Sequence, residues 1–362
     1  MRLVVTGGGT GGHVYPALEI ARTAREAGHE VLYLGSIRGQ EGKLCHENGF
    51  EFVGFRSEPI RSWKRPQGWN AALQILRASG RAKAKLIDWR ADAVFSTGGY
   101  SSAPIVKAAR SAGVPYVIHE QNTVPGRTNR IMGRHAAAIA TTFKSGHEHF
   151  GKTKVVRTGM PIRRELRQSA QGNLFGHQTP DTKPLILVMG GSQGATRLNE
   201  AAMATATRMA GVGAHWLVAA GPKNYDGLLE SKRKLGIGDE FDVRAYLDAE
   251  EMASALFRAT VVVCRSGGSL AELAAFRKPS VLIPLPIAMG NHQFFNAKEF
   301  EGMGAAQILE QSDLATSTLE ARIRHWLAEP EAYAHAQDAL AEWDLPDAAQ
   351  RILALIEESA AR

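Results

Sequence analysis

Two stretches of this sequence follow one pattern and decide its fold: Val4-Val5-Thr6-Gly7-Gly8-Gly9-Thr10-Gly11-Gly12-His13 and Val188-Met189-Gly190-Gly191-Ser192-Gln193-Gly194. Each is a short apolar run that enters a glycine-rich turn and then a helical pattern. Such a turn lets the backbone approach a phosphate or a sugar, and it points the first N–H groups of the helix at that ligand. Because the repeat distance is about half of the chain, the sequence predicts two similar α/β domains rather than a solenoid.

Short apolar runs alternate with helical patterns along the rest of the chain. This alternation predicts an α/β fold with parallel sheets built from right-handed crossover units. The runs that we expect to form strands are Leu3–Val5, Val31–Leu34, Ala93–Phe95, Tyr116–Ile118, Leu185–Met189, His215–Val218, Val261–Cys264 and Val281–Ile283.

The length of 362 residues also favours two domains, each large enough to bury its own core. Residues 168–182 are polar and rich in Gly, Gln and Thr, which predicts a surface connection and places the boundary near 158–183. Apolar residues with helical spacing predict a terminal amphipathic helix within 345–362. These residues are Ala348, Ile352, Leu355 and Ile356.

The composition is that of a soluble globular protein, with 44% hydrophobic and 22% charged residues. No segment approaches the roughly 18 uncharged apolar residues of a membrane span. Residues 2–6 run directly into the first glycine turn without the features of a signal peptide, so we expect a cytoplasmic protein. Cys45 and Cys264 are too few for a disulfide framework or a zinc site, and we expect reduced thiols.

The net charge of +7 predicts attraction to a polyanion, which leaves nucleic acid, anionic lipid and a diphosphate substrate open. Much of this charge falls in residues 60–90, where eight cations face the single acid Asp88. The cations are Arg61, Lys64, Arg65, Arg77, Arg81, Lys83, Lys85 and Arg90, and the same stretch contains Trp63, Trp69 and Trp89. A solvated basic face is the plain alternative for this stretch. The sequence shows no recognisable nucleic-acid-binding module, so no nucleic-acid partner is expected.

The first glycine turn has the G-x-G-x-x-G spacing, but a dinucleotide site is disfavoured. Such a site needs an acid at the end of the second strand, where this chain has Tyr33-Leu34-Gly35-Ser36. His13 lies at the start of the following helix and is a candidate general base, since an imidazole there can take a proton near neutral pH. A turn without a ligand, and a capping or packing role for His13, remain the alternatives.

Polar side chains follow two further strands of the first half. One group lies in the glycine loop at residues 96–104, which contains Tyr100, and the other is His119-Glu120-Gln121-Asn122. Because the carboxyl ends of parallel strands meet at one edge of a sheet, these groups should converge on a hydroxyl-rich or amide-bearing ligand. The alternative is that His119, Glu120 and Asn122 only bind loop backbone.

In the second half, the turn at residues 190–195 offers N–H groups and the Ser192 hydroxyl as an anion site. A glycine turn at 265–268 precedes Glu272, which suits ribose hydroxyls, although a first-turn glutamate often only favours the helix dipole. His292 and Gln293 follow another strand and suit sugar hydroxyls. No D-x-D triplet or metal-ligand spacing occurs, so the leaving-group charge is assigned to helix N-termini and to Arg163 or Arg164.

Taken in order, these motifs resemble the MurG glycosyltransferases. The matching segments are the first glycine loop, Gly98-Gly99-Tyr100-Ser101-Ser102-Ala103-Pro104, His119-Glu120-Gln121-Asn122, Gly190-Gly191-Ser192-Gln193-Gly194-Ala195, and His292-Gln293 with Asn296-Ala297. The resemblance spans nearly the whole chain. It implies the GT-B fold, with two Rossmann-like domains facing each other across a cleft. The implied bounds are 1–160, with a returning helix at 342–362, and 161–341.

The resemblance also implies the reaction. N-acetylglucosamine would pass from UDP-N-acetylglucosamine to the MurNAc 4-hydroxyl of lipid I, which is undecaprenyl-pyrophosphoryl-MurNAc-pentapeptide, and would give the peptidoglycan precursor lipid II. The transfer would be inverting and would need no metal or other cofactor. The protein would bind the cytoplasmic face of the cell membrane peripherally, and residues 60–90 are our candidate for the contact with anionic lipid.

By the same resemblance, His13 and Glu120 are the candidate catalytic residues. The expected acceptor-side and sugar contacts are Thr10, Gly11, Gly12, Tyr100 and Asn122. The expected donor contacts are Arg163 and Ser192 at the diphosphate, the Leu247 backbone at uracil, Gly268, Ser269, Leu270 and Ala271 at the nucleotide, Glu272 at the ribose, and His292 and Gln293 at the sugar hydroxyls.

The chain departs from the family pattern at three places. The glycine turn before Glu272 is one residue shorter, Asn291 replaces an acid, and Met160 replaces an asparagine. Two rival functions remain open at this point. One is a UDP-N-acetylglucosamine epimerase, which would need acid and base carboxylates around the sugar and no lipid acceptor. The other is a non-catalytic sensor or nucleic-acid-binding protein.

Overall fold

The computed structural model describes residues 1–9, 11–58, 66–172, 183–191 and 194–361. The chain forms two compact units. Unit 1 consists of Met1–Ile162 and Asp347–Arg362, and unit 2 is Arg163–Pro346. The bounds expected from the sequence end the first segment at 160 and the second at 341, which is two and five residues earlier.

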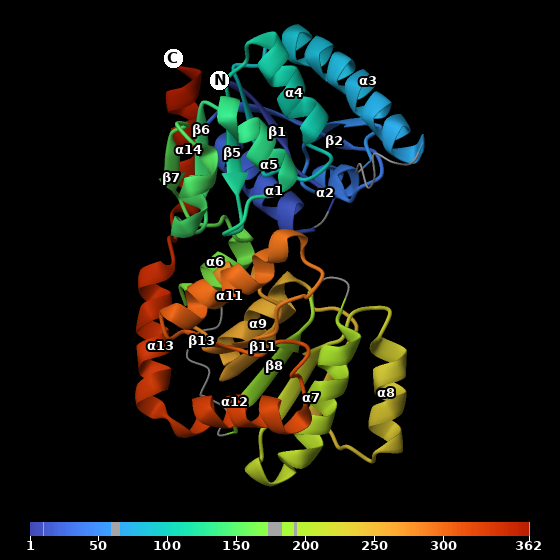
Figure 1. Ribbon diagram of the computed structural model, residues 1–362, viewed down its shortest axis with the longest axis vertical. Helices are drawn as coiled ribbons and strands as arrows, with labels where there is room; N and C mark the ends of the chain where they lie inside the picture. Colours follow the sequence, from blue (N-terminus) through green and yellow to red (C-terminus); the bar gives the residue numbers. More distant parts are fainter. Residues whose placement is uncertain (10, 59–65, 173–182, 192–193, 362) are drawn as a thin grey trace. The chain divides into compact units, whose positions relative to one another are not determined.

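Unit 1 is built on a parallel sheet of seven strands in the order β3-β2-β1-β4-β5-β6-β7 (Figure 1). The strands are β1 Arg2–Thr6, β2 Glu30–Ser36, β3 Glu51–Phe55, β4 Ala93–Ser96, β5 Tyr116–Glu120, β6 Ala138–Thr141 and β7 Val155–Arg157. The helices are α1 Gly11–Glu26, α2 Glu41–Glu47, α3 Pro66–Asp88, α4 Ala103–Ala112, α5 Arg127–Met132 and α14 Ala348–Ala360, with short 3₁₀ helices η1 Gly133–His135 and η2 Lys144–Phe150.

Alternate residues of the central strands fill two cores, one on each face of the sheet. On β1, Leu3 and Val5 pack with α1 and α14, whereas Val4 packs with α3 and α4. All three side chains are fully buried. Burial of one such side chain stabilises a fold by about 1.5–3 kcal/mol. Cover on both faces explains why β1 is a continuous apolar run.

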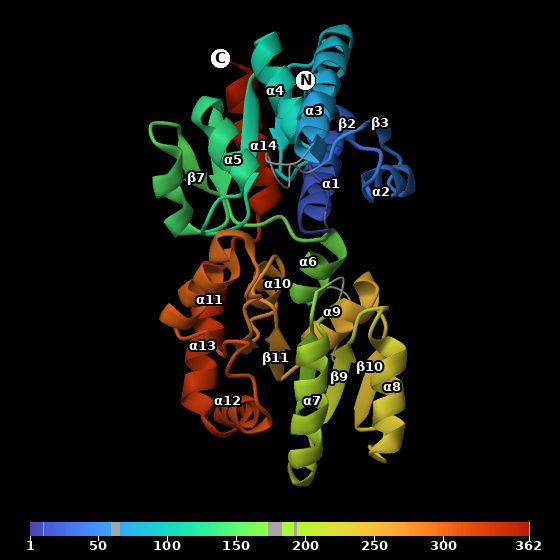
Figure 2. The ribbon, with the colours of Figure 1, turned by 45° about the vertical axis from the view of Figure 1, so that its right-hand side comes forward.

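Unit 2 is a parallel sheet of six strands in the order β10-β9-β8-β11-β12-β13 (Figure 2). The strands are β8 Leu185–Met189, β9 His215–Ala219, β10 Phe241–Arg244, β11 Val261–Cys264, β12 Ser280–Leu282 and β13 Ala306–Ile308. The helices are α6 Arg164–Ala170, α7 Thr196–Arg208, α8 Tyr225–Lys234, α9 Ala249–Arg258, α10 Ser269–Ala275, α11 His292–Gly302, α12 Thr316–Ala328 and α13 Pro330–Trp343, with η3 Ala210–Val212 and η4 Met289–Asn291. Its core includes Val188, Trp216 and Val263.

The terminal helix α14 returns to unit 1, as the resemblance implied. It contacts α1, and Ile352 and Ile356 are fully buried in the same cluster as Leu3 (Figures 1 and 2). Two contacts bind its end to the rest of unit 1: Glu357 forms a hydrogen bond with His29 at 2.8 Å, and Glu358 forms an ion pair with Lys154 at 2.6 Å. The predicted amphipathic helix is therefore confirmed.

Five strands lie outside the predicted set, and four of them are the outermost strands of the two sheets. These four are β3, β7, β10 and β13. Outer strands are short and partly polar because one side of the strand is not covered by a neighbour. The fifth, β6, has the sequence Ala-Ile-Ala-Thr. It contains only one large apolar side chain, so it is not recognised as an apolar run. The first residues of the predicted surface connection are helical, since α6 extends through Ala170 and buries Ser169. Residues 173–182 of that connection lie outside the described residues.

Candidate functional site

The first glycine turn joins β1 to α1 and is held from three directions. The Tyr33 hydroxyl donates to the Gly7 carbonyl at 2.5 Å, and Thr97 Oγ1 donates to the His13 carbonyl at 2.7 Å. The Gly9 N–H donates to Glu41 Oε1 at 3.2 Å. Gly9 has a φ of 89°, a left-handed conformation that favours glycine.

His13 is the third residue of α1 and is half-buried. Burial lowers the pKa of His119, and the charge of His13 adds to this effect. Gly11 and Gly12 form the start of the same helix, while Thr10 lies outside the described residues. The candidate base is therefore at the carboxyl edge of the sheet, in the first turn of α1.

The second glycine loop brings Tyr100 to the first turn. A Cβ at Gly99 would lie 2.4 Å from the Gly8 carbonyl oxygen, so only glycine lets the two loops touch. A Cβ at Gly9 would lie 2.6 Å from Tyr100 Cε1. Burial raises the pKa of Tyr100, and the negative charge of Glu41 adds to the rise.

Glu120 is a buried carboxylate that organises the loop after β5. Oε1 accepts from the Asn122 N–H at 2.9 Å and from Asn122 Nδ2 at 3.2 Å. Oε2 accepts from the Gly126 N–H at 3.1 Å and from Asn129 Nδ2 at 2.9 Å. Burial raises the pKa of Glu120, and these four hydrogen bonds oppose the rise. The geometry corresponds to the loop-binding alternative for Glu120 and Asn122.

His119 is fully buried beside this loop. Its Nε2 lies 2.9 Å from the Gly159 carbonyl and donates to it. Nδ1 has no hydrogen-bond partner among the described residues. Burial lowers the pKa of His119 to about 4, so the ring is neutral at pH 7.

The corresponding turn of unit 2 joins β8 to α7. Gly191 and Gly194 have φ values of 83° and 74°. A Cβ at Gly194 would lie 2.1 Å from the Ala220 carbonyl oxygen, which also accepts from Asn199 Nδ2 at 2.9 Å. The turn is therefore packed closely on the end of β9. Ser192 lies outside the described residues.

Arg163 and Glu272 meet within unit 2. Arg163 directly precedes α6, and its Nη2 lies 3.6 Å from Glu272 Oε1 in the first turn of α10. Burial raises the pKa of Glu272, and the guanidinium of Arg163 opposes the rise. The pair places one positive and one negative group at the same turn, a combination that can bind a phosphate and ribose hydroxyls.

The glycine turn before α10 is bound to the segment that follows β12. Ser266 Oγ donates to the Gln293 carbonyl at 2.7 Å, and a Cβ at Gly267 would lie 3.7 Å from Gln293 Nε2. Gln293 Oε1 accepts from the Leu285 N–H at 2.9 Å. The turn that precedes Glu272 therefore lies against Gln293, and the role of both residues at a donor site stays a prediction.

The remaining expected donor residues also belong to unit 2. The N–H groups of Leu270 and Ala271 already donate within the turn, to the Gly267 and Gly268 carbonyls at 3.2 and 3.4 Å. Gly268 is the N-cap residue of α10 and Ser269 is its first residue. Leu247 is buried between β10 and α9. His292 Nδ1 donates to the Met289 carbonyl at 2.9 Å.

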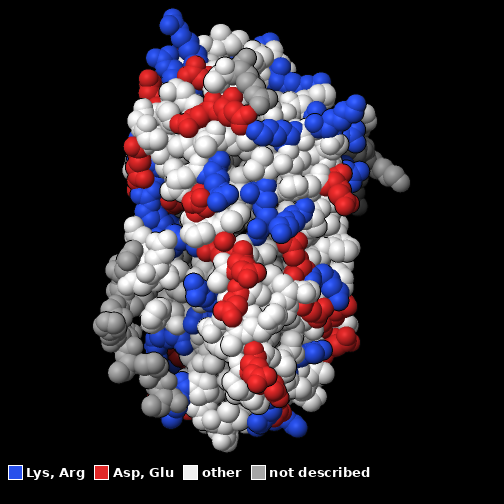
Figure 3. All heavy atoms as spheres, turned by 90° about the vertical axis from the view of Figure 1, so that its left-hand side faces the viewer, with Lys and Arg blue, Asp and Glu red and all other residues white. Residues whose placement is uncertain are grey.

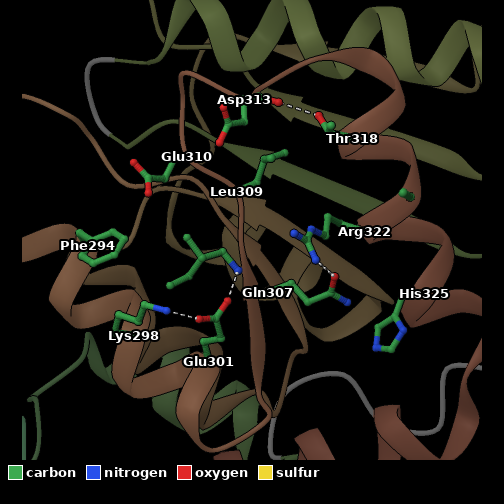
Figure 4. A pocket seen from close by; sticks show the side chains of 12 residues that line it. Phe294, Lys298, Glu301, Gln307, Leu309, Glu310, Asp313, Thr318, Arg322 and His325 are labelled. Atoms are coloured by element: carbon green, nitrogen blue, oxygen red, sulfur yellow. Dashed lines mark hydrogen bonds and ion pairs between the residues drawn. The ribbon is translucent and has the colours of Figure 1, made fainter.

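A separate surface pocket of unit 2, about 590 Å³ in volume, lies between α11, β13 and α12. Its cations are already engaged, since Lys298 pairs with Glu301 at 2.7 Å and Arg322 donates to Gln307 at 3.2 Å (Figure 4). None of the predicted site residues lines it. We therefore do not assign the nucleotide to this pocket. The described part of the chain has no group of three metal-ligating side chains.

The long helix α3 has an exposed apolar stripe. It packs on α4 through Ala78, Ala82 and Leu86, which are buried (Figures 1 and 2). On its outer side Trp69, Leu73, Leu76 and Ile87 are 65%, 44%, 53% and 60% exposed. Arg77 and Arg81 are exposed near this stripe, and Lys85 pairs with Glu51 at 3.6 Å. Residues 59–65, with Arg61, Trp63, Lys64 and Arg65, lie outside the described residues.

On the face shown in Figure 3, Lys and Arg side chains are interspersed with Asp and Glu. None of the helices in the described ranges is both long enough and apolar enough to cross a membrane.

Comparison with known proteins identifies the family. Residues 3–141 match the N-terminal domain of glycosyltransferase family 28, and residues 185–352 match its C-terminal domain. A relative from Halothermothrix orenii is 35% identical over 370 residues, covering 99% of each chain. It is named UDP-N-acetylglucosamine--N-acetylmuramyl-(pentapeptide) pyrophosphoryl-undecaprenol N-acetylglucosamine transferase. The chain belongs to the MurG family of glycosyltransferases.

Further comparisons agree with MurG family membership. A relative of the same name from Bacillus cytotoxicus is 33% identical over 367 residues, covering 99% of each chain. The crystal structure of MurG from Acinetobacter baumannii has a TM-score of 0.79 and 27% identity, again over 99% of each chain. The two parallel-sheet units are thus those of a GT-B glycosyltransferase, as the resemblance implied. A UDP-GlcNAc 2-epimerase from Neisseria meningitidis has a TM-score of 0.72 but 12% identity, a likeness of fold alone.

Two residues at these turns have no counterpart in the sequence predictions. Glu41 binds the first glycine turn, and its sequence surroundings, Ile37-Arg38-Gly39-Gln40, are those of an ordinary polar loop. Arg265 binds the carbonyls of Ile283 and Pro284 at 2.9 and 3.1 Å and so fixes the end of β12. No residue spacing in the sequence predicts either contact, because both join loops that meet only in the folded unit.

Proposed function

We propose that this glycosyltransferase moves N-acetylglucosamine from UDP-N-acetylglucosamine to the MurNAc 4-hydroxyl of undecaprenyl-pyrophosphoryl-MurNAc-pentapeptide. The observation that carries the proposal is the full-length match to relatives named for this transfer. The site chemistry supports it, since unit 1 places a histidine at the start of the helix that follows its first glycine turn, and unit 2 pairs a guanidinium with a carboxylate at a glycine turn.

In the proposed reaction, the acceptor oxygen attacks the anomeric carbon opposite the departing diphosphate. The new C–O bond forms as the bond to the phosphate oxygen breaks, and UDP leaves with the electron pair. His13 takes the proton of the acceptor hydroxyl. Glu120 positions Asn122 and the loop after β5, and Gly11, Gly12 and Tyr100 contact the acceptor sugar; Thr10 is assigned to the same side by resemblance.

The donor is assigned to unit 2. Arg163 and the Ser192 turn stabilise the diphosphate charge that develops as UDP leaves. Glu272 accepts from ribose hydroxyls, and donor binding would free it from Arg163. The Leu247 backbone contacts uracil, Gly268, Ser269, Leu270 and Ala271 line the nucleotide, and Gln293 with His292 contacts the sugar hydroxyls.

Transfer from labelled UDP-N-acetylglucosamine to a short-chain lipid I analogue tests the activity. We expect labelled disaccharide product, UDP release that requires the acceptor, and no loss of rate in EDTA. An epimerase would instead convert the nucleotide sugar in the absence of acceptor. UDP release that is independent of acceptor, or conversion of UDP-N-acetylglucosamine to its 2-epimer, would contradict the assignment.

We further propose that the chain binds the cytoplasmic face of the cell membrane peripherally, through α3. The support is the exposed stripe of Trp69, Leu73, Leu76 and Ile87 beside Arg77 and Arg81. Apolar and aromatic side chains enter the interface, and each cation near an anionic surface contributes about 1 kcal/mol.

Sedimentation with vesicles that contain anionic phospholipid tests this surface. The double variant R77E/R81E should lose most of its vesicle binding, whereas the matched variant K232E/R233E on α8 should retain it. Equal binding by the two variants would remove α3 from the proposal without affecting the transfer activity in detergent.

A further inference from the structure

Glu41, the first residue of α2, is a buried carboxylate that no part of the proposed mechanism uses. Its side chain is completely buried in unit 1. Oε1 accepts from the Gly9 N–H at 3.2 Å, and Oε2 has no hydrogen-bond partner in the described part of the chain. Its negative charge also contributes to raising the pKa of Tyr33 and Tyr100, after burial itself.

A carboxylate in this position is costly for stability. A buried charge loses its hydration, and the loss is offset only where hydrogen bonds or opposite charges satisfy both oxygens. Among the described residues, Glu120 of the same unit receives four such bonds, whereas Glu41 receives one. Packing alone would favour an apolar side chain at this position, so the Gly9 contact is the feature that requires Glu41.

The carboxylate is tightly enclosed between two glycines. A Cβ at Gly8 would lie 1.7 Å from Glu41 Oε1, and a Cβ at Gly39 would lie 1.5 Å from Oε2. Gly8 belongs to the first turn, and Gly39 belongs to the loop between β2 and α2. Glu41 therefore locks the turn to the neighbouring β2–α2 loop.

We propose that Glu41 is a positioning residue, whose hydrogen bond to Gly9 fixes the first glycine turn so that the start of α1 and His13 face the acceptor. This inference rests on the proposed function, which puts the acceptor at this turn. Glu41 does not touch the reacting atoms. It acts through the conformation of Gly8 and Gly9.

Substitution of Glu41 separates the hydrogen bond from the charge. Glu41→Gln keeps an oxygen that accepts from Gly9, whereas Glu41→Ala removes it. For Glu41→Ala we expect a Gly9 amide that exchanges with deuterium at least about tenfold faster, and an acceptor KM raised about tenfold. The donor KM should stay within about twofold, and Glu41→Gln should restore both readouts. The control is Glu19→Ala, which removes a buried glutamate of α1 that pairs with Arg22.

Gly39→Ala provides an independent route to the same displacement. Its Cβ would push the carboxylate away without altering the turn itself, so it should reproduce the Glu41→Ala effects. In the double variant the collision is absent, and Gly39→Ala should add nothing to Glu41→Ala. Thermal unfolding of each variant identifies any that fail to fold, and Glu41→Gln keeps the test valid if Glu41→Ala is among them.

The outcomes separate this inference from the proposed function. Unchanged Gly9 exchange in Glu41→Ala, or Glu41→Gln behaving as poorly as Glu41→Ala, would overturn the positioning role. Faster Gly9 exchange with a raised donor KM and an unchanged acceptor KM would retain the positioning role and contradict the assignment of the acceptor to unit 1.

Discussion

The glycine turns of the two units share one backbone plan but differ in the charge that lies against them. In unit 1 the turn is bound by the buried carboxylate of Glu41. In unit 2 the turn before α10 lies beside Arg265 and the Arg163–Glu272 pair. A negative surrounding disfavours phosphate, whereas a guanidinium favours it. These charges support the proposed assignment of the hydroxyl acceptor to unit 1 and of the diphosphate donor to unit 2.

The largest expected effect is the loss of the base. His13→Ala should lower kcat by about 10²–10⁴-fold, the usual contribution of general base catalysis, because no group then takes the acceptor proton. The affinity for UDP should not change. Steady-state kinetics with both substrates varied measures this, and His149→Ala, at an exposed position on η2, is the control. A variant with nearly full kcat would assign the base elsewhere.

A smaller effect is expected from the donor side. Glu272→Ala should raise the donor KM about 10–100-fold, because hydrogen bonds to a charged group contribute about 1.5–3 kcal/mol. Glu250→Ala, in the first turn of α9, removes a glutamate at a comparable helix position and should leave the donor KM unchanged. If Glu272→Ala raised only the acceptor KM, the assignment of the donor to unit 2 would be wrong.

The smallest effect concerns stability and pH. The folded pKa of His119 is about 4, below its ordinary value of 6.5, so the unfolded state binds the proton more tightly. Its contribution to stability is complete above pH 6.5 and is lost as the pH falls toward 4. At pH 5.5 the loss is about 1.4 kcal/mol, or roughly one pKa unit.

His119→Gln tests this pH dependence, since glutamine keeps a donor for the Gly159 carbonyl and does not titrate. Urea unfolding at pH 8 and pH 5.5 should show a smaller difference in unfolding free energy for the variant than for the native chain. If the unfolding free energy changed equally between the two pH values in the variant and the native chain, protonation of His119 would not cause the loss of stability.

The sequence predicts most of the fold because burial on both faces leaves continuous apolar runs. Runs such as Leu185–Met189 can be found without any structure. The same criterion does not identify β3, β7, β10 and β13. These are outer strands, and one edge of each has no neighbouring strand, so their sequences are partly polar. The motifs also place His13 at the start of the helix after β1 and Glu120 at the end of β5, where the structure has them, and their catalytic roles stay predictions.

Contacts between loops are the part that could not be predicted. Glu41 reaches Gly9 across 32 positions of the chain, and nothing in its neighbourhood distinguishes it from a surface glutamate. The loop-binding role of Glu120 required the positions of Gly126 and Asn129, which follow it in no recognised spacing.

Calorimetric titration with UDP tests the division between the two turns most directly. Glu272→Ala and Arg163→Ala should each weaken UDP binding at least about tenfold, whereas His13→Ala and Glu41→Ala should bind UDP within about twofold of the native chain. Native affinity in both unit 2 variants, or loss of UDP binding in either unit 1 variant, would contradict the account.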